Sequence, residues 1–285
     1  MNKRFLSKTA GKLVLACLFG ASLFAAPILY SVSGDLSGVQ RVLEKLDAGA
    51  SVTPLTELGD GSTAFNGGLV YRSSDDLLYA IENDGFNEST LVSMSTDGNL
   101  TPFQLQLGNG FIGGLTFDPT DQLFYAIGSL RDSQALYSID ITGPGTVSML
   151  FLLSGGVYNG GLAYHAGDGG LYTIFQDDNA NSSIGKIDLS TQVVTPASGL
   201  TLGKGFYGGL ASDGTQFYAI STDANADSTL WNFKLTDGSP TSIMGAGQGY
   251  YAAGLAVVQT PEPGSLWLCA TFLFALPLVR RLGVR

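Results

Sequence analysis

The feature that constrains the fold most is a pentapeptide that returns five times at nearly constant intervals. It consists of an aromatic residue, a variable residue, Gly or Ala, Gly and Leu, and its copies occupy residues 65–69, 111–115, 158–162, 206–210 and 251–255. Successive leucines are 46, 47, 48 and 45 residues apart. Periods of this length are typical of propeller blades and of helical arrays.

Inside each unit, the residue pattern indicates β-strands. Short runs of β-branched or aromatic residues alternate with turn residues, and in the first unit these runs cover 68–71, 77–81, 90–94 and 100–107. A Tyr-centred motif follows the first four pentapeptides, at 78–81, 124–127, 171–174 and 217–220. Since no segment sustains a helical period, we expect four antiparallel strands per unit, which make one propeller blade.

The incomplete units set the number of blades. The last unit stops after one strand, at 255–258, and its three missing strands are matched near the start of the chain, at 29–32, 39–43 and 52–55. Four whole units and one split unit predict an all-β, five-bladed propeller of four-stranded blades, whose terminal blade is shared between the N- and C-terminal segments. Joining the ends in one blade removes exposed sheet edges.

The paired glycines have two interpretations. Gly67 and Gly68, with their equivalents in the other units, open the innermost strand of each blade. There the backbones of all blades crowd around the axis, and a side chain would obstruct them. The alternative is that these glycines only form turns.

The first 26 residues are typical of a secretory signal peptide. Four basic residues precede an apolar run at 13–26, and they are Lys3, Arg4, Lys8 and Lys12. This order predicts a signal helix over 1–26 that is removed after export. An uncleaved membrane anchor is the alternative. The propeller then covers 27–259.

The last 26 residues, 260–285, have three parts. Pro261, Glu262 and Pro263 come first, an apolar run follows at 266–279, and Arg280 and Arg281 follow that run. As a helix the 14-residue run would span about 21 Å of a hydrocarbon core roughly 30 Å thick. The basic end should stay on the cytoplasmic side, which leaves the propeller outside.

This three-part order resembles the PEP-CTERM sorting signal of exopolysaccharide-producing Gram-negative bacteria. The resemblance implies a short C-terminal transmembrane helix, recognition by an exosortase in the inner membrane, and removal of the tail near 261–263. It also implies delivery to the cell surface or extracellular matrix. The repeats are similar to uncharacterised bacterial propellers with recurring Leu-Tyr-Ala-Ile strands, a likeness that bears on fold and not on activity.

Charge and cysteine content exclude several functions. Seven of the 14 basic residues lie in the two terminal segments, whereas 23 of the 24 acidic residues lie between them. A ring this acidic is not expected to bind nucleic acid. Both cysteines, Cys17 and Cys269, also lie in the terminal segments, and His165 is the single histidine. Thiol catalysis and histidine–cysteine zinc sites are therefore excluded from residues 27–259.

Two polar loops have the alternate oxygen ligands of a calcium loop. These residues are Asp177, Asn179 and Asn181 in one loop, and Asp223, Asn225 and Asp227 in the other. Neither loop has the glycine or the distal glutamate that usually follow, so an ordinary solvated hairpin is the alternative. No other cofactor is expected.

The aromatic residues of the pentapeptides are candidates for sugar binding. They are Phe65, Phe111, Tyr158, Phe206 and Tyr251. Rings at the face of a propeller can form stacking platforms for sugars. Packing between blades is the alternative, because every blade needs such a residue.

The loops recur without a unique catalytic cluster, and the innermost strands carry acids only at their outer ends, at Asp118 and Asp213. We therefore interpret the protein as an exported binding or structural component of the cell surface or extracellular matrix, associated with exopolysaccharide. An enzyme is the less favoured class. The alternative is a secreted carbohydrate-active hydrolase that uses acidic residues on the propeller face.

Overall fold

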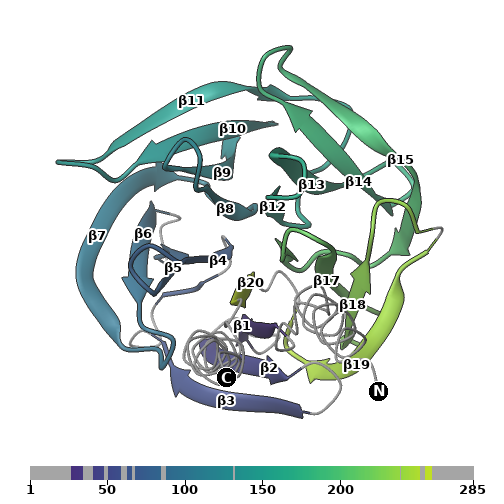
Figure 1. The fold of residues 1–285 in the computed structure, drawn as a ribbon, viewed down its shortest axis with the longest axis horizontal. Coiled ribbons are helices and arrows are strands. Elements are labelled where there is room, and N and C mark those ends of the chain that lie inside the picture. The colour runs from purple at the N-terminus through teal and green to yellow at the C-terminus, as the bar shows by residue number, and fades with distance from the viewer. Residues whose placement is uncertain are drawn as a thin grey trace, which may run out of the picture. The chain divides into compact units, whose positions relative to one another are not determined.

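The computed structural model describes residues 27–34, 41–47, 51–58, 63–65, 68–84, 88–130, 132–237, 239–250 and 254–258. These residues form twenty β-strands in five four-stranded sheets and contain no helix. The sheets follow one another around a ring (Figure 1). The predicted all-β, five-bladed propeller of four-stranded blades is confirmed. The expected signal peptide and sorting signal, with their helices, lie outside the described residues.

Blades 1 to 4 each follow the chain from the innermost to the outermost strand. Blade 1 contains β4 (Leu69–Arg72), β5 (Leu77–Asn83), β6 (Glu88–Met94) and β7 (Leu100–Asn109). Blade 2 contains β8 (Leu115–Asp118), β9 (Leu123–Leu130), β10 (Ser133–Asp140) and β11 (Thr146–Leu153). Blade 3 contains β12 (Leu162–His165), β13 (Gly170–Gln176), β14 (Asn181–Asp188) and β15 (Val193–Lys204). Blade 4 contains β16 (Leu210–Ser212), β17 (Phe217–Thr222), β18 (Asp227–Phe233) and β19 (Thr241–Gln248).

Blade 5 has the strand order β20-β1-β2-β3. Its strands are β20 (Leu255–Val258), β1 (Ile28–Gly34), β2 (Arg41–Asp47) and β3 (Ser51–Glu57). β20 pairs antiparallel with β1, with Ile28 opposite Val258 and Ser31 opposite Leu255. The Ser31 hydroxyl donates a hydrogen bond of 2.7 Å to the carbonyl of Gly254. The strand expected at 39–43 begins and ends later, at Arg41–Asp47.

Five glycines form a contact ring at the start of the innermost strands. A Cβ on any of them would overlap the backbone of the leucine that begins the next blade. The glycine and leucine pairs are Gly68 with Leu115, Gly114 with Leu162, Gly161 with Leu210, Gly209 with Leu255, and Gly254 with Leu69. The last pair leads from blade 5 back to blade 1, where the Cβ would lie 2.6 Å from the Leu69 nitrogen. The crowding predicted at the axis is confirmed.

The hydrophobic core lies between the blades. Each buried cluster collects side chains from the facing sides of two neighbouring sheets. The cluster between blades 1 and 2, for example, contains Tyr79, Phe117 and Phe124. Burial of apolar area at these five interfaces stabilises the ring. Among the described residues no helix is long and apolar enough to cross a membrane.

Candidate functional site

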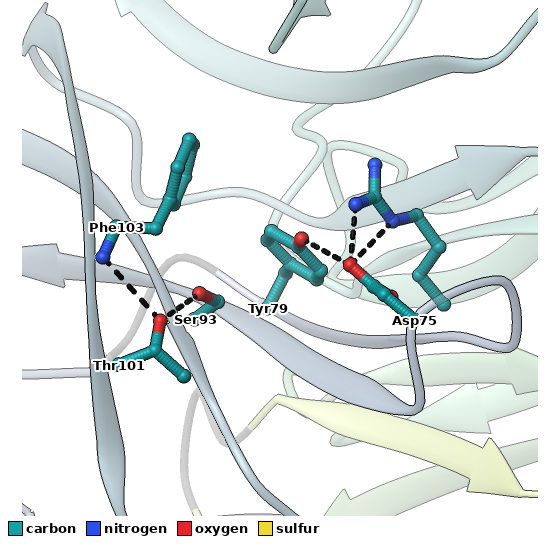
Figure 2. A network of polar contacts seen from close by, with 6 residues as sticks. Asp75, Tyr79, Ser93, Thr101 and Phe103 are labelled. Atoms are coloured by element: carbon teal, nitrogen blue, oxygen red, sulfur yellow. Dashed lines mark hydrogen bonds and ion pairs between the residues drawn. The ribbon is translucent and has the colours of Figure 1, made fainter.

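A tyrosine–aspartate pair recurs on one face of the ring. We call this the turn face, because it carries the turns at 73–76, 119–122, 166–169 and 213–216, which join the first and second strands of blades 1 to 4. In each of these blades, the second-strand tyrosine donates its hydroxyl to an aspartate of the turn. The pairs are Tyr79 and Asp75 at 2.7 Å (Figure 2), Tyr125 and Asp121 at 3.5 Å, Tyr172 and Asp168 at 2.6 Å, and Tyr218 and Asp213 at 3.1 Å.

The pairs hold the hydroxyls protonated. Burial, aided by the neighbouring carboxylate, raises the pKa of Tyr125 and that of Tyr172 to about 12. The same causes raise the pKa of Tyr79 and that of Tyr218. Each tyrosine is therefore a hydrogen-bond donor at neutral pH.

Two of these aspartates also bind a cation. In blade 1, Arg72 Nε donates to Asp75 at 3.0 Å, and the guanidinium lies 4.9 Å from the centre of the Tyr79 ring. Burial alone would raise the pKa of Asp75, but the hydrogen bonds from Arg72 and Tyr79 outweigh it and lower that pKa. In blade 3, Lys186 Nζ lies 2.7 Å from Asp168. Burial alone would raise the pKa of Asp168 as well, but the hydrogen bonds from Lys186 and Tyr172 outweigh it and lower that pKa.

The residue three positions after the ring leucine varies among the blades and is aspartate in two of them. These equivalent residues are Arg72, Asp118, His165, Asp213 and Val258. Arg72 reaches across the interface between blades 1 and 2, where its guanidinium lies 5.7 Å from the centres of both the Phe117 and the Phe124 rings. The side chain therefore seals that interface at the turn face.

His165 seals the interface between blades 3 and 4 in the same way. Its ring stacks on Phe217 with centroids 4.7 Å apart, and its Nδ1 lies 2.7 Å from the hydroxyl oxygen of Ser212. The single histidine of the sequence is thus part of an interblade contact.

A pocket opens between blades 2 and 3, at the equivalent place. It encloses about 370 Å³. Its lining consists of Asp118, residues 169–171, residues 186–191 and Thr195. Leu171 occupies the position that Phe124 and Phe217 occupy in the sealed interfaces, so that a smaller side chain faces the short Asp118. The smallest pockets that bind small molecules in proteins have about this volume.

Asp118 is the least compensated acid of this pocket. It is 7% exposed, and one of its carboxylate oxygens accepts a 2.7 Å hydrogen bond from the Thr120 amide. In the described part of the chain it forms no ion pair. A buried carboxylate is costly unless it accepts hydrogen bonds or meets a cation. Asp118 is therefore suited to a ligand that donates hydrogen bonds.

The remaining walls of the pocket are charged, hydroxylic and apolar, and they include Lys186, whose Nζ lies 2.7 Å from Asp168. Asp188 accepts hydrogen bonds from the Ser190 hydroxyl and from the amides of Ser190 and Thr191, and these bonds lower its pKa to about 2. Ser190, Thr191 and Thr195 bring hydroxyls, and Ile187 brings apolar surface. Carboxylates and hydroxyls beside an apolar wall can hold a polyhydroxylated molecule.

The two candidate calcium loops are β-hairpin turns in which the first aspartate binds the turn itself. Asp177 Oδ1 accepts hydrogen bonds of 2.9 Å from the amides of both Asn179 and Asn181. Asp223 Oδ1 likewise accepts from the amides of Asn225 and Asp227, at 2.8 and 3.0 Å. The described residues contain no group of three or more His, Cys, Asp or Glu able to hold a metal ion. Calcium binding stays a prediction.

The pentapeptide aromatics lie between blades. Phe65, Phe111, Tyr158 and Phe206 are only 1 to 2% exposed. The Phe111 backbone is also bound across the interface, since its amide donates to Ser89 Oγ at 3.1 Å. Their ring faces are covered, so in this structure they belong to the core and offer no stacking platform.

In blade 5 the equivalent aromatic residue is Tyr250. The backbone carbonyl of the residue before each aromatic accepts a hydrogen bond from an amide at the end of the second strand. The Ser129 amide donates to Gly110, the Thr222 amide to Gly205, and the Gly34 amide to Gly249. Gly249 precedes Tyr250, which is 2% exposed. Tyr251, chosen from its spacing to Leu255, lies outside the described residues, as do Pro261, Glu262, Pro263, Arg280 and Arg281.

Asp118 was noted in the sequence only as an acid at a strand end. The signal that could have singled it out is the comparison of the five residues three positions after each ring leucine. A position that holds four residue types in five repeats is not needed by the repeat itself.

Comparison with known proteins identifies a family and a fold. A family model described as "Repeat of unknown function (DUF6923)" matches residues 39–247. No match was found among curated proteins. The solved structure of a nidogen/laminin complex is similar with a TM-score of 0.52 at 13% identity, covering 82% of this chain and 98% of that chain.

Two bacterial structures are also similar. TolB from Acinetobacter baumannii has a TM-score of 0.50 at 13% identity, covering 83% of this chain and 57% of that chain. A putative TolB from Agrobacterium tumefaciens has a TM-score of 0.50 at 15% identity, covering 82% and 90%. At such low identities these similarities show the propeller fold alone.

Proposed function

The chain belongs to the family described as a repeat of unknown function, DUF6923, and we propose that it is an exported propeller that acts as a binding or structural protein. The observation that carries the proposal is the pocket between blades 2 and 3. It opens between two repeat units, and it contains a buried carboxylate, Asp118, that forms no ion pair among the described residues, while Lys186 in the same pocket pairs with Asp168. We propose hydroxyl-rich carbohydrate of the exopolysaccharide kind as its ligand.

The carboxyl groups favour binding over hydrolysis. A glycosidase needs a general acid whose pKa is raised, together with a second carboxylate. Five described carboxyls have displaced pKa values, and all five are lowered: Asp75, Asp140, Asp168, Asp177 and Asp188. Asp188, which shares the pocket with Asp118, stays ionised and satisfies its own turn. The secreted hydrolase is therefore the weaker alternative.

The terminal segments support export and sorting. The basic and apolar order of 1–26 fits a signal peptide. The Pro-Glu-Pro motif, the apolar run and the arginines of 260–285 resemble a PEP-CTERM signal. We therefore propose that an exosortase removes the tail and that the propeller reaches the cell surface or matrix.

We also propose that blade 5 closes the ring by pairing strands from both ends of the exported domain. Support comes from the pairing of β20 with β1 and from the approach of Gly254 to Leu69. Deleting residues 254–258 should then abolish cooperative unfolding, whereas deleting 260–285 should leave it unchanged. Equal melting curves for the two truncations would contradict the proposal that blade 5 closes the ring.

The binding proposal is tested with the exported, processed protein. We expect binding on an array of acidic and neutral glycans, and we expect it to persist in EDTA if calcium is not required. The test variant is Asp118→Asn, which keeps the shape of the side chain and removes its charge, and should weaken binding by about tenfold or more. Binding that is unaffected by Asp118→Asn contradicts the site. Release of reducing ends from a bound polysaccharide would favour the hydrolase.

A further inference from the structure

The outermost strand of every blade is a sheet edge, and edges invite pairing with other chains unless they are protected. Proline is one such protection, since it lacks an N–H and is accepted where the N–H would face away from the sheet. Blade 3 has Pro196 opposite Gly185, and blade 5 has Pro54 opposite Glu44. These two positions are equivalent, because Thr195 and Thr53 before them pair with Lys186 and Lys45.

Blade 1 has a proline at the same register. Ser93 pairs with Tyr79 as Lys186 pairs with Tyr172, and its hydroxyl oxygen lies 2.5 Å from that of Thr101 (Figure 2). Pro102 follows Thr101. Three outer strands thus carry Thr-Pro at one register.

Blade 2 lacks this protection. There Ser148 pairs with Ser138, and the next residue, opposite Tyr137, is Met149. Because proline is accepted at this register in three sheets, the N–H of residue 149 is expected to point away from its sheet. β11 therefore offers a backbone donor where blades 1, 3 and 5 offer none.

β11 is also apolar and uncharged. Its eight residues contain no charged side chain and no proline. Met149 is 52% exposed, Leu150 37% and Leu152 51%. An exposed, uncharged and hydrophobic edge strand is a site for strand pairing.

We propose that β11 pairs antiparallel with β11 of a second copy, so that two rings join edge to edge about a two-fold axis. The reason for a second copy is that β11 matches itself, because an uncharged and apolar edge then meets an uncharged and apolar edge. The chain carries a net charge of -10, so most contacts between two copies bring like charges together. The uncharged β11 edge avoids this repulsion, and it offers no charge that would select a basic or an acidic partner. A two-fold contact of a strand with itself places Met149, Leu150 and Leu152 beside the same apolar residues of the other copy.

This assembly does not depend on the ligand of the pocket. It goes beyond the proposed function, because a monomeric propeller could bind carbohydrate equally well. Two rings would present two pockets, and linked sites bind a polymer more tightly than one site does.

The test is the oligomeric state of the exported, processed protein, measured by light scattering and sedimentation over a concentration series. We expect a monomer–dimer equilibrium. Met149→Pro should raise the dimer dissociation constant by about 10- to 100-fold, because the two-fold axis makes one substitution remove two backbone hydrogen bonds. The variant should fold, since blades 1, 3 and 5 carry proline there.

The matched control is Ser242→Pro in blade 4. Ser242 stands opposite Trp231, the equivalent register, on an outer strand that the proposal leaves unpaired. This variant should leave the dimer unchanged. If Met149→Pro does not fold, Leu152→Lys brings like charges together across the axis and should also dissociate the dimer.

A protein that stays monomeric at all concentrations overturns the proposal. So does a dimer that survives both Met149→Pro and Leu152→Lys, and so does a complex in which β11 is covered by a different protein.

Discussion

The interface between blades 1 and 2 and the interface between blades 2 and 3 share a scaffold and differ at the turn face. In both, a glycine approaches the leucine of the next blade, and buried aromatic and aliphatic residues fill the space behind it. At the first, Arg72 lies over Phe117 and Phe124. At the second, Asp118 and Leu171 leave a pocket. The repeat therefore builds the ring, and the variable residue at the end of the innermost strand, together with the residue that faces it from the next blade, decides which of these two interfaces is sealed and which is open.

The largest expected effect tests the shared scaffold. Gly68→Ala and Gly114→Ala place a methyl group on the backbone of the next blade, so each should lower the free energy of unfolding by about 3 kcal/mol or more. Urea unfolding measures this. Gly108→Ala is the control, because Gly108 has a positive φ of 91° but no atom within 4 Å of its Cβ position. It should cost about 1–2 kcal/mol. Equal losses at Gly108 and Gly114 would show that the ring contact is not tight.

The next effect compares the two cations of the turn face. Arg72→Ala removes an ion pair with side chains 17% and 26% exposed, and it also removes ring contacts in two blades. We expect a loss of about 2 kcal/mol. Lys186→Ala breaks a pair that is 43% and 39% exposed, and should cost less than about 1 kcal/mol. Thermal or urea unfolding distinguishes the two. A larger loss for Lys186→Ala would contradict the sealing role of Arg72.

A third substitution makes the open interface between blades 2 and 3 resemble the sealed interfaces. Leu171→Phe places in blade 3 the residue that blades 2 and 4 have as Phe124 and Phe217. We expect stability to change by no more than about 1 kcal/mol, because the larger ring enters existing space. Carbohydrate binding should be lost, and calorimetry measures it. Leu78→Phe, at the equivalent position in blade 1, is the control and should leave binding intact.

The smallest effect is the response to acid. Asp75 and Asp168 have pKa values below the ordinary value of 3.8, so their stabilising contribution is present above that pH and is lost as the pH falls through their folded-state pKa values. The melting temperature should therefore be level near neutrality and decline below about pH 4. Asp75→Asn should flatten the decline more than Asp168→Asn, since Asp75 is the less exposed. A decline that both variants leave unchanged would contradict this.

The sequence predicted the repeat well and its irregularities poorly. Leucine spacing located all five innermost strands, because a closely packed ring requires glycine and leucine at fixed places. At the fifth repeat the spacing to Leu255 points to Tyr251, which lies outside the described residues, and one extra residue separates Tyr250 from Leu255 compared with the other blades. The hydrogen bond between Gly34 and Gly249 identifies Tyr250, and that contact joins residues far apart in the chain.

The sequence by itself determined the class of fold, the number of blades and the acidic character of the ring. These follow from local periodicity, from residues that only a crowded backbone requires, and from composition. Tertiary structure alone decided that Asp118 faces Leu171, that Arg72 and His165 seal their interfaces, and that Met149 stands where other blades have proline. Each of these depends on which side of a strand meets which neighbouring blade, and packing sets that relation between residues distant in sequence.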